Sequence, residues 1–272
     1  MNDQKAPRAG AGHHQAPRAG AGHLDAPDEA NEWKRRAIAI PVAMLLALGF
    51  HAWGTGHFMQ RTALTMPLHE LGHAITGWFC GFTALPTFWK TLIPEVRGTI
   101  APVAVALGAG YLVVTGWQAQ QIWRWALGLA IGVAGLAGML GISVATAQVA
   151  ITFGGDGGAM VLGTVFMLAF LVGPESRLRA GGLRYGLLAI GAAAFVDTFS
   201  TWWSARTNED AIPFGEIEGV GLSDPSKLQD VFGWATRTIV DRYVTLGSLC
   251  LIVLAAAWLW SIRSARRGEG AP

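Results

Sequence analysis

Seven apolar segments dominate the sequence and constrain the fold more than any other feature. A helix that crosses a bilayer needs about 20 mostly apolar residues, and runs near that length recur along this chain. The composition agrees, with 52% hydrophobic and 14% charged residues, whereas soluble domains average about 25% charged. We expect an all-α integral membrane protein, a polytopic helical bundle of six or seven transmembrane segments. The segments are 37–54, 62–82, 98–117, 123–152, 158–172, 183–204 and 238–262.

Three clusters of positive charge bear on the topology, at 34–36, 177–184 and 263–267. The positive-inside rule would place all three in the cytoplasm, but seven full spans would put the chain ends on opposite sides. Either one of the first five segments is re-entrant or the rule fails once. We expect a multi-pass protein of a prokaryotic plasma membrane, with a cytoplasmic N-terminal tail.

The chain divides into three regions by composition. Residues 1–32 carry the tandem repeat QKAPRAGAGH–HQAPRAGAGH, which is too polar and too small in its side chains to bury a core, so we expect a disordered tail. Residues 33–267 form the helical transmembrane domain, with a polar loop at 205–233, and 268–272 form a short C-terminal tail. The net charge of +2 gives no reason to expect nucleic acid as a partner. Cys80 and Cys250 form no CxxC pair, and a packing role fits both.

The segment at 62–82 contains the motif HELGH. His69 and His73 are four residues apart, so on a helix they share a face and can bind one metal ion. Glu70 is displaced around the helix and can address a water on that metal. A catalytic zinc takes three protein ligands and keeps a place for water. Because ionisable residues inside a membrane segment are costly, we expect a zinc site here, with Glu70 as the catalytic base.

For the third zinc ligand, Asp156 in FGGDGG is the favoured candidate. It sits at what we predict to be a glycine-rich junction between two apolar segments, where a cap of the next helix is the simpler alternative. Asp197 lies deep in its span and is a second candidate, or a partner that orients a histidine. His51 and His57 precede the motif and either line the site or lie at the interface. Asp224, followed by proline, indicates an N-cap that opens a short helix in the polar loop.

HELGH on a membrane helix, followed later by a DGG element, resembles the site-2 protease family of intramembrane zinc metalloproteases. The resemblance covers roughly 62–172 and implies zinc bound by His69, His73 and Asp156, with Glu70 as catalytic base. Gly155 precedes the aspartate where the family has leucine, and the family's Asn–Pro stretch is absent. The resemblance also implies that 81–98 lies along the membrane and holds substrate as an added strand; a plain connecting loop is the alternative.

These features predict an intramembrane zinc metalloprotease that hydrolyses a peptide bond of a membrane-embedded or membrane-adjacent protein. Its partners would be that substrate and the lipid bilayer. Two alternatives remain. One is a metal-binding membrane protein without proteolysis, either a transporter or an inactive relative. The other is a zincin of the CAAX-protease type, which would want further glutamates on its helices.

Overall fold

The computed structural model describes residues 31–269 except 174–175, 177, 180–181 and 218–220. The predicted N-terminal tail therefore lies outside the described residues, save that Glu32, which we placed in it, already begins the first helix. The helices are α2 (Glu32–Ala52), α3 (Gly54–Met59), η1 (Gln60–Thr65), α4 (Met66–Phe79), α5 (Ile100–Gln118), α6 (Ile122–Leu140), α7 (Val144–Ala169), α8 (Leu183–Ser204), η3 (Glu209–Ala211), α9 (Asp224–Ser226), η4 (Lys227–Val231) and α10 (Thr236–Glu269).

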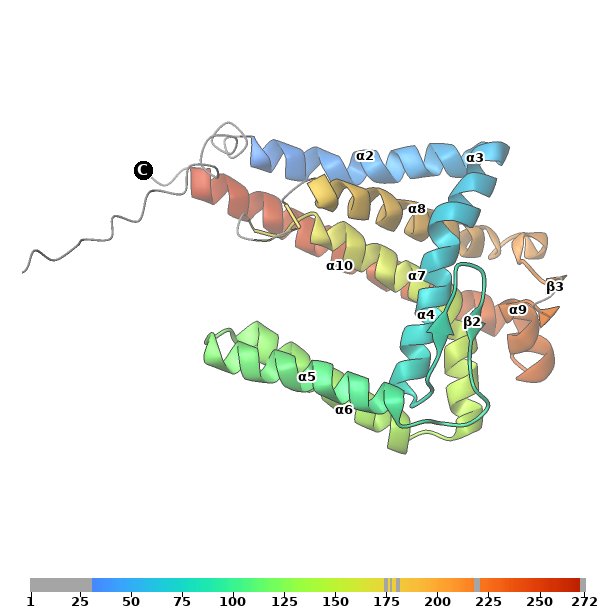
Figure 1. Cartoon of the computed structure of the whole chain (residues 1–272). Helices are drawn as coiled ribbons and strands as arrows, with labels where there is room; N and C mark the ends of the chain where they lie inside the picture. Colours follow the sequence, from blue (N-terminus) through green and yellow to red (C-terminus); the bar gives the residue numbers. More distant parts are fainter. Residues whose placement is uncertain (1–30, 174–175, 177, 180–181, 218–220, 270–272) are drawn as a thin grey trace, which may run out of the picture.

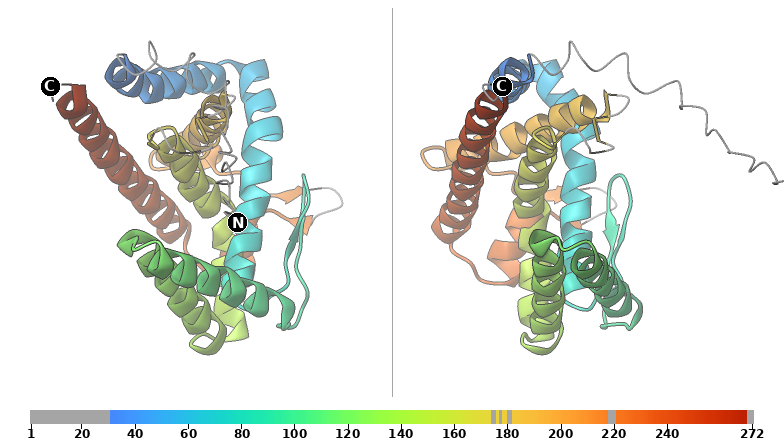
Figure 2. Two further views of the ribbon diagram at one scale, coloured as in Figure 1. Left: turned by 60° about the vertical axis from the view of Figure 1, so that its left-hand side comes forward. Right: turned by 90° about the vertical axis from the view of Figure 1, so that its left-hand side faces the viewer.

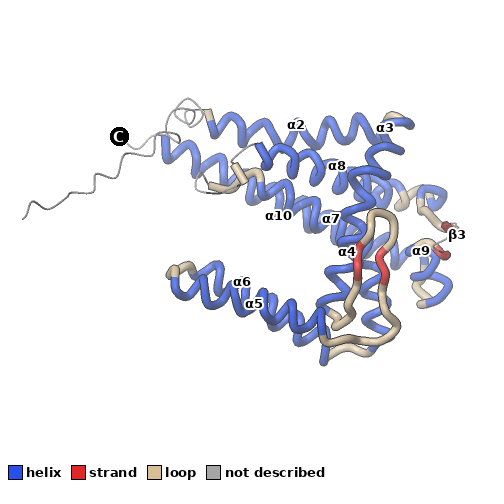
Figure 3. The backbone as a smooth tube through the Cα atoms, viewed as in Figure 1, coloured by secondary structure: helices blue, strands red, loops and turns tan. Residues whose placement is uncertain are grey.

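Within the described residues, sheet structure is confined to two short antiparallel hairpins (Figure 3). In the first, β1 (Leu85–Pro86) pairs with β2 (Thr91–Leu92), with Leu85 opposite Leu92. In the second, β3 (Glu216–Ile217) pairs with β4 (Gly221–Leu222) within the polar loop. The fold is otherwise helical, as expected.

Five of the described helices are long and apolar enough to cross a membrane, namely α2, α5, α6, α7 and α10. On α5 and α6 most of the apolar surface faces outward, because only 17% and 11% of their apolar windows are buried inside the protein. Leu107, Leu136 and Leu140 are among the large side chains left exposed there. Such surfaces are stable in lipid but not in water. The chain is therefore a helical membrane protein.

The boundaries of two predicted segments are wrong. We expected a break at FGGDGG between 123–152 and 158–172, but α7 runs through that motif without interruption. The break lies earlier, where α6 ends at Leu140 and the Ser143 side chain accepts a hydrogen bond from the Thr146 backbone N–H to cap α7. The glycines serve close helix packing instead: a Cβ on Gly72 of α4 would lie 2.3 Å from the Gly154 carbonyl oxygen.

The helices do not all run in one direction. In Figure 1, α3, η1 and α4 follow one another as a rod that runs crosswise to the directions of α2 and α5. Helices α5 and α6 form a hairpin that projects from beside the C-terminal end of this rod. Figure 2 shows the same rod from two further sides. The N-terminal end of α2 contacts the start of α8, since Arg184 Nη1 of α8 lies 2.9 Å from Glu32 Oε1 of α2.

The three positive clusters of the sequence lie at one end of this bundle. Arg36 Nη2 donates to the carbonyl of Val172, which follows the end of α7. The Arg266 guanidinium near the end of α10 lies 4.6 Å from the Trp33 ring centroid. The start of α2, the α7–α8 connection and the end of α10 are therefore neighbours in space.

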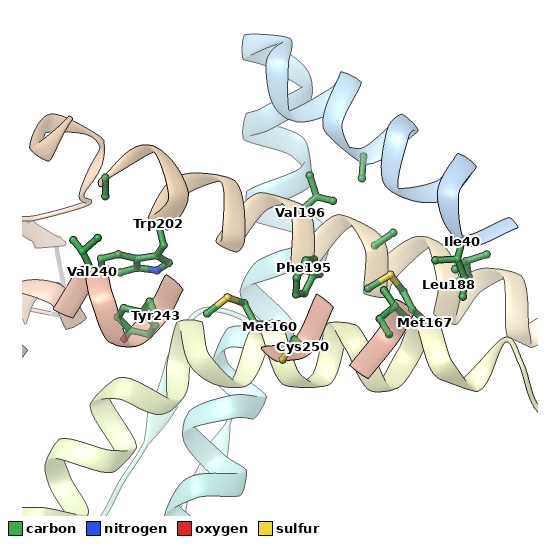
Figure 4. Packing of buried hydrophobic residues seen from close by; sticks show 14 of the residues in the cluster. Ile40, Met160, Met167, Leu188, Phe195, Val196, Trp202, Val240, Tyr243 and Cys250 are labelled. Atoms are coloured by element: carbon green, nitrogen blue, oxygen red, sulfur yellow. The ribbon is translucent and has the colours of Figure 1, made fainter. Parts of the chain in front are cut away.

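The main core is built where α7, α8 and α10 meet (Figure 4). Met160, Phe195, Trp202 and Tyr243 are essentially inaccessible to solvent. The Trp202 and Tyr243 rings stack with centroids 4.1 Å apart. Both cysteines are buried and unpaired. This packing fixes the middle of α7, which carries Asp156.

Candidate metal centre

The HELGH motif lies on α4, and Pro67 occupies the first turn of that helix. Because helical residues also precede it, Pro67 lies where the π-helical segment changes to the α-helix, a place where its missing N–H interrupts the hydrogen-bond pattern. The preceding segment η1 is π-helical and leads directly into α4. His69, Glu70 and His73 are all buried, so the motif faces the protein and not the lipid.

The two histidines and Asp224 of α9 converge on one point. His69 Nε2 lies 3.1 Å from His73 Nε2, and Asp224 Oδ2 lies 3.1 Å from the first nitrogen and 2.9 Å from the second. Tetrahedral zinc with bonds of about 2.0–2.1 Å separates its ligand atoms by about 3.3 Å. The three atoms are thus spaced as ligands of one small cation.

The opposite ring nitrogens are both engaged. His73 Nδ1 donates to the Ile151 carbonyl oxygen at 2.6 Å, and His69 Nδ1 donates to Asp156 Oδ1 at 2.9 Å. A carbonyl only accepts, so the proton of a neutral His73 must sit on Nδ1, and the carboxylate favours the same tautomer of His69. Both Nε2 atoms then carry lone pairs that face each other. Such an arrangement suits a bound cation.

Asp156 therefore occupies a different place from the one predicted. Besides His69 Nδ1, it accepts a hydrogen bond from Trp202 Nε1 at 2.8 Å, and its Oδ1 lies 3.6 Å from Arg61 Nη2. The oxygen that faces the two Nε2 atoms belongs to Asp224. Asp156, on α7, is buried. It orients the His69 ring by accepting a hydrogen bond from Nδ1, the ring nitrogen opposite Nε2.

Asp224 was placed correctly at a short helix but given the wrong position in it. The N-cap is Ser223, whose Oγ accepts from the Ser226 backbone N–H, so Asp224 is the first residue inside α9. Its carboxylate is thereby free to face the histidines. Burial alone would raise the pKa of Asp224, but positive charge on the His73 and His69 imidazoles lowers that pKa well below its usual range. When both Nε2 atoms carry lone pairs instead, a bound cation would have to supply that positive charge. The carboxylate is therefore ionised.

Glu70 lies beside the three converging atoms. Its Oε2 accepts a hydrogen bond from Thr91 Oγ1 of β2 at 2.8 Å. That hydroxyl also lies 2.7 Å from the Glu70 carbonyl oxygen. The first hairpin is therefore tied to the HELGH helix at the residue predicted to act as base.

A cavity of about 550 Å³ opens onto these groups. Its walls come from α4, from the first hairpin at Trp89–Ile93 and from the polar loop around Phe214 and Pro225. The polar loop therefore supplies both a wall of this cavity and Asp224. The cavity is large enough to hold part of a peptide.

Gly155, directly before Asp156, lies against both imidazole rings. A Cβ at this position would lie 2.6 Å from His69 Cε1 and 2.6 Å from His73 Nε2. Only a residue without a side chain leaves room for both rings against α7. The glycine run therefore belongs to the site as well as to the helix packing.

A second group of polar residues lies around Asp197 of α8, which we had considered as an alternative ligand. It does not reach the HELGH histidines. Its Oδ2 lies 3.2 Å from Arg61 Nη1, and its Oδ1 lies 3.3 Å from His51 Nδ1 and 2.9 Å from His57 Nε2. His51 and His57 therefore belong to this group and not to the first cavity.

Comparison of the chain with protein-family models, with curated proteins and with solved structures finds no match. The function is therefore inferred from the geometry of the site.

Proposed function

We propose that this protein is an intramembrane zinc metalloprotease that cuts a peptide bond of a membrane-embedded or membrane-adjacent protein. The observation that carries the proposal is the convergence of His69 Nε2, His73 Nε2 and Asp224 Oδ2, with both Nδ1 atoms already engaged. Two nitrogens and one carboxylate oxygen match the ligand set of catalytic zinc. Asp224, and not Asp156, is the third ligand in this proposal.

The chemistry would divide among a few residues. Zinc bound to the three ligands would supply a polarised water as nucleophile near neutral pH. Glu70 would accept the proton of that water and return it to the leaving amine. Thr91 Oγ1, 2.8 Å from Glu70 Oε2, would help to orient the carboxylate for this role. Asp156 would keep the His69 ring in the orientation that presents Nε2.

The same proposal accounts for the topology. With α8, a helix of 22 residues, as a sixth span beside α2, α5, α6, α7 and α10, both chain ends lie on one side of the membrane. The rod of α3, η1 and α4 would then be the segment that does not cross. All three positive clusters, which meet at one end of the bundle, would face the cytoplasm of a prokaryotic cell, as the positive-inside rule requires.

Substrate would approach along the first hairpin. Leu85, Trp89 and Leu92 are exposed there, and Thr91 ties the hairpin to Glu70. An extended peptide that pairs with such an edge gains main-chain hydrogen bonds without depending on its side chains. This agrees with what the family resemblance implies for 81–98.

Glu70→Gln tests the proposal. The variant should retain zinc, because Glu70 is not among the converging atoms, but lose proteolysis by about 10²–10⁴-fold, the typical contribution of a general acid–base. Zinc per chain is measured on purified protein, and cleavage by comparing new N-termini in membranes that express the wild type or the variant. Undiminished cleavage by Glu70→Gln would overturn the proposed mechanism. Absence of cleavage by the wild type itself would favour a metal-binding role.

A metal transporter is the second candidate, and the group around Asp197 is the observation in its favour. A transport path needs successive sites that a cation can reach. Here Arg61 lies between the two groups, with its guanidinium contacting both Asp197 and Asp156. A fixed positive charge at that point opposes the passage of cations, so we favour proteolysis.

A further inference from the structure

His51, His57 and Asp197 form a second cluster of possible metal ligands. They come from the end of α2, from α3 and from α8, and one ligand atom of each lies within 4.8 Å of the others. The two imidazole rings lie next to each other, tilted by 56°, with centroids 4.3 Å apart. The rod of α3, η1 and α4 packs against α8 through η1 (Figure 1). We propose that this cluster is a second binding site for a divalent transition metal, separate from the HELGH centre.

The chemistry of the donor atoms supports this assignment. His51 Nδ1 and His57 Nε2 both point at a single oxygen, Asp197 Oδ1, at 3.3 and 2.9 Å. These spacings are close to the roughly 3.3 Å that separates the ligand atoms of tetrahedral zinc. Imidazole and carboxylate together suit zinc, cobalt and similar ions better than calcium or magnesium.

The second cluster has one buried ligand and two ligands that are partly exposed. The Asp197 side chain is fully buried, whereas the side chains of His51 and His57 are 19% and 42% exposed. An ion can therefore reach the histidines from outside without crossing the protein core. The remaining coordination positions would be filled by water.

Arg61 keeps the second cluster separate from the first. Its Nη1 is 3.2 Å from Asp197 Oδ2, and its Nη2 is 3.6 Å from Asp156 Oδ1. The guanidinium stays charged and occupies the Asp197 oxygen that faces inward. Oδ1 is left as the ligand atom, and an ion held there does not approach the HELGH cavity.

We expect the second site to bind more weakly than the first. Within the described part of the chain, no hydrogen bond fixes His51 Nε2 or His57 Nδ1, whereas both HELGH rings are held from behind. Loss of such orienting partners typically lowers metal affinity by about 10–100-fold. The adjacent Arg61 charge acts in the same direction.

Zinc titration of the full-length protein tests the inference. The protein is purified in detergent through a tag without histidine, stripped with a chelator and titrated with Zn²⁺ against a chromophoric competitor. His13, His14 and His23 of the tail are replaced by alanine in every sample, because those side chains could bind zinc themselves. The expected result is two zinc ions per chain, the second about 10–100-fold weaker.

Variants assign each ion to its cluster. His57→Ala and His51→Ala should each lose the weaker ion and keep the tighter one, and the retained ion shows that the fold is intact. Phe58→Ala, a neighbour that is 69% exposed, is the matched control and should keep both. His73→Ala should lose only the tighter ion. A single zinc per chain that His57→Ala keeps and His73→Ala loses, or two zinc ions in His57→Ala, would overturn the second site without touching the first.

Discussion

Two clusters in this molecule share the same ligand types, two histidines and one aspartate, yet their surroundings differ. In the HELGH centre both rings are buried, and Asp156 and Ile151 hold their Nδ1 atoms. In the second cluster His57 is half-exposed, and Arg61 occupies the far oxygen of its aspartate. The two clusters therefore have the same ligand types but differ in the residues that contact and orient those ligands.

This difference predicts which cluster would catalyse hydrolysis and which would only bind a metal ion. Fixed rings, a general base and a cavity are all present only at the HELGH centre among the described residues, where Glu70 lies in a cavity of about 550 Å³. The second cluster has ligands and access from outside, but its carboxylate is already neutralised by a guanidinium. We therefore expect hydrolysis at the first and binding alone at the second.

Among the acidic residues, the largest effect on metal binding should come from Asp224→Ala. Removing a ligand leaves two nitrogens, and we expect zinc affinity at the HELGH centre to fall by more than about 100-fold, beyond the usual effect of a supporting residue. Competition titration measures the change. The second cluster should be unaffected, because its own aspartate is Asp197.

The matched control for that variant is Asp230→Ala, an acidic residue of the adjacent η4 that lies outside both ligand groups. It should bind zinc as the wild type does. Equal losses in the two variants would mean that the loop, and not the Asp224 carboxylate, supports the centre.

Asp156→Asn should have an intermediate effect. The amide can still accept a hydrogen bond from His69 Nδ1 but lacks the charge that strengthens it, so zinc affinity should fall by about 10–100-fold. The same titration distinguishes the two aspartates directly. If Asp156→Asn abolished zinc binding while Asp224→Ala kept it, Asp156 would be the ligand after all.

What the sequence could and could not predict follows from the range of each interaction. His69 and His73 share a face because of helical periodicity, a local property, and the structure places them together as expected. Asp224 approaches them from a distant loop, and nothing local distinguishes its Ser-Asp-Pro context from an ordinary helix start. The prediction of a helix break at FGGDGG was wrong for a similar reason. These glycines contact Gly72 and the two histidine rings of α4, and such a contact between helices leaves no local signal in the sequence.

The smallest and most discriminating effect is expected for Arg61→Gln, because Arg61 touches both clusters. At the HELGH centre Arg61 supports Asp156 only at 3.6 Å, and Trp202 also holds that carboxylate, so zinc affinity should fall by about tenfold at most. At the second cluster the lost charge had repelled the bound cation. An interaction of about 1 kcal/mol between solvated charges at 4 Å predicts roughly fivefold tighter binding there.

The two sites should therefore respond to Arg61→Gln in opposite directions, which a general loss of stability would not produce. Arg61→Lys, which retains the charge, is the control and should leave the second site close to its original affinity. Should both sites weaken together in Arg61→Gln, Arg61 would serve to orient both aspartates, and its charge would not be what separates the two clusters.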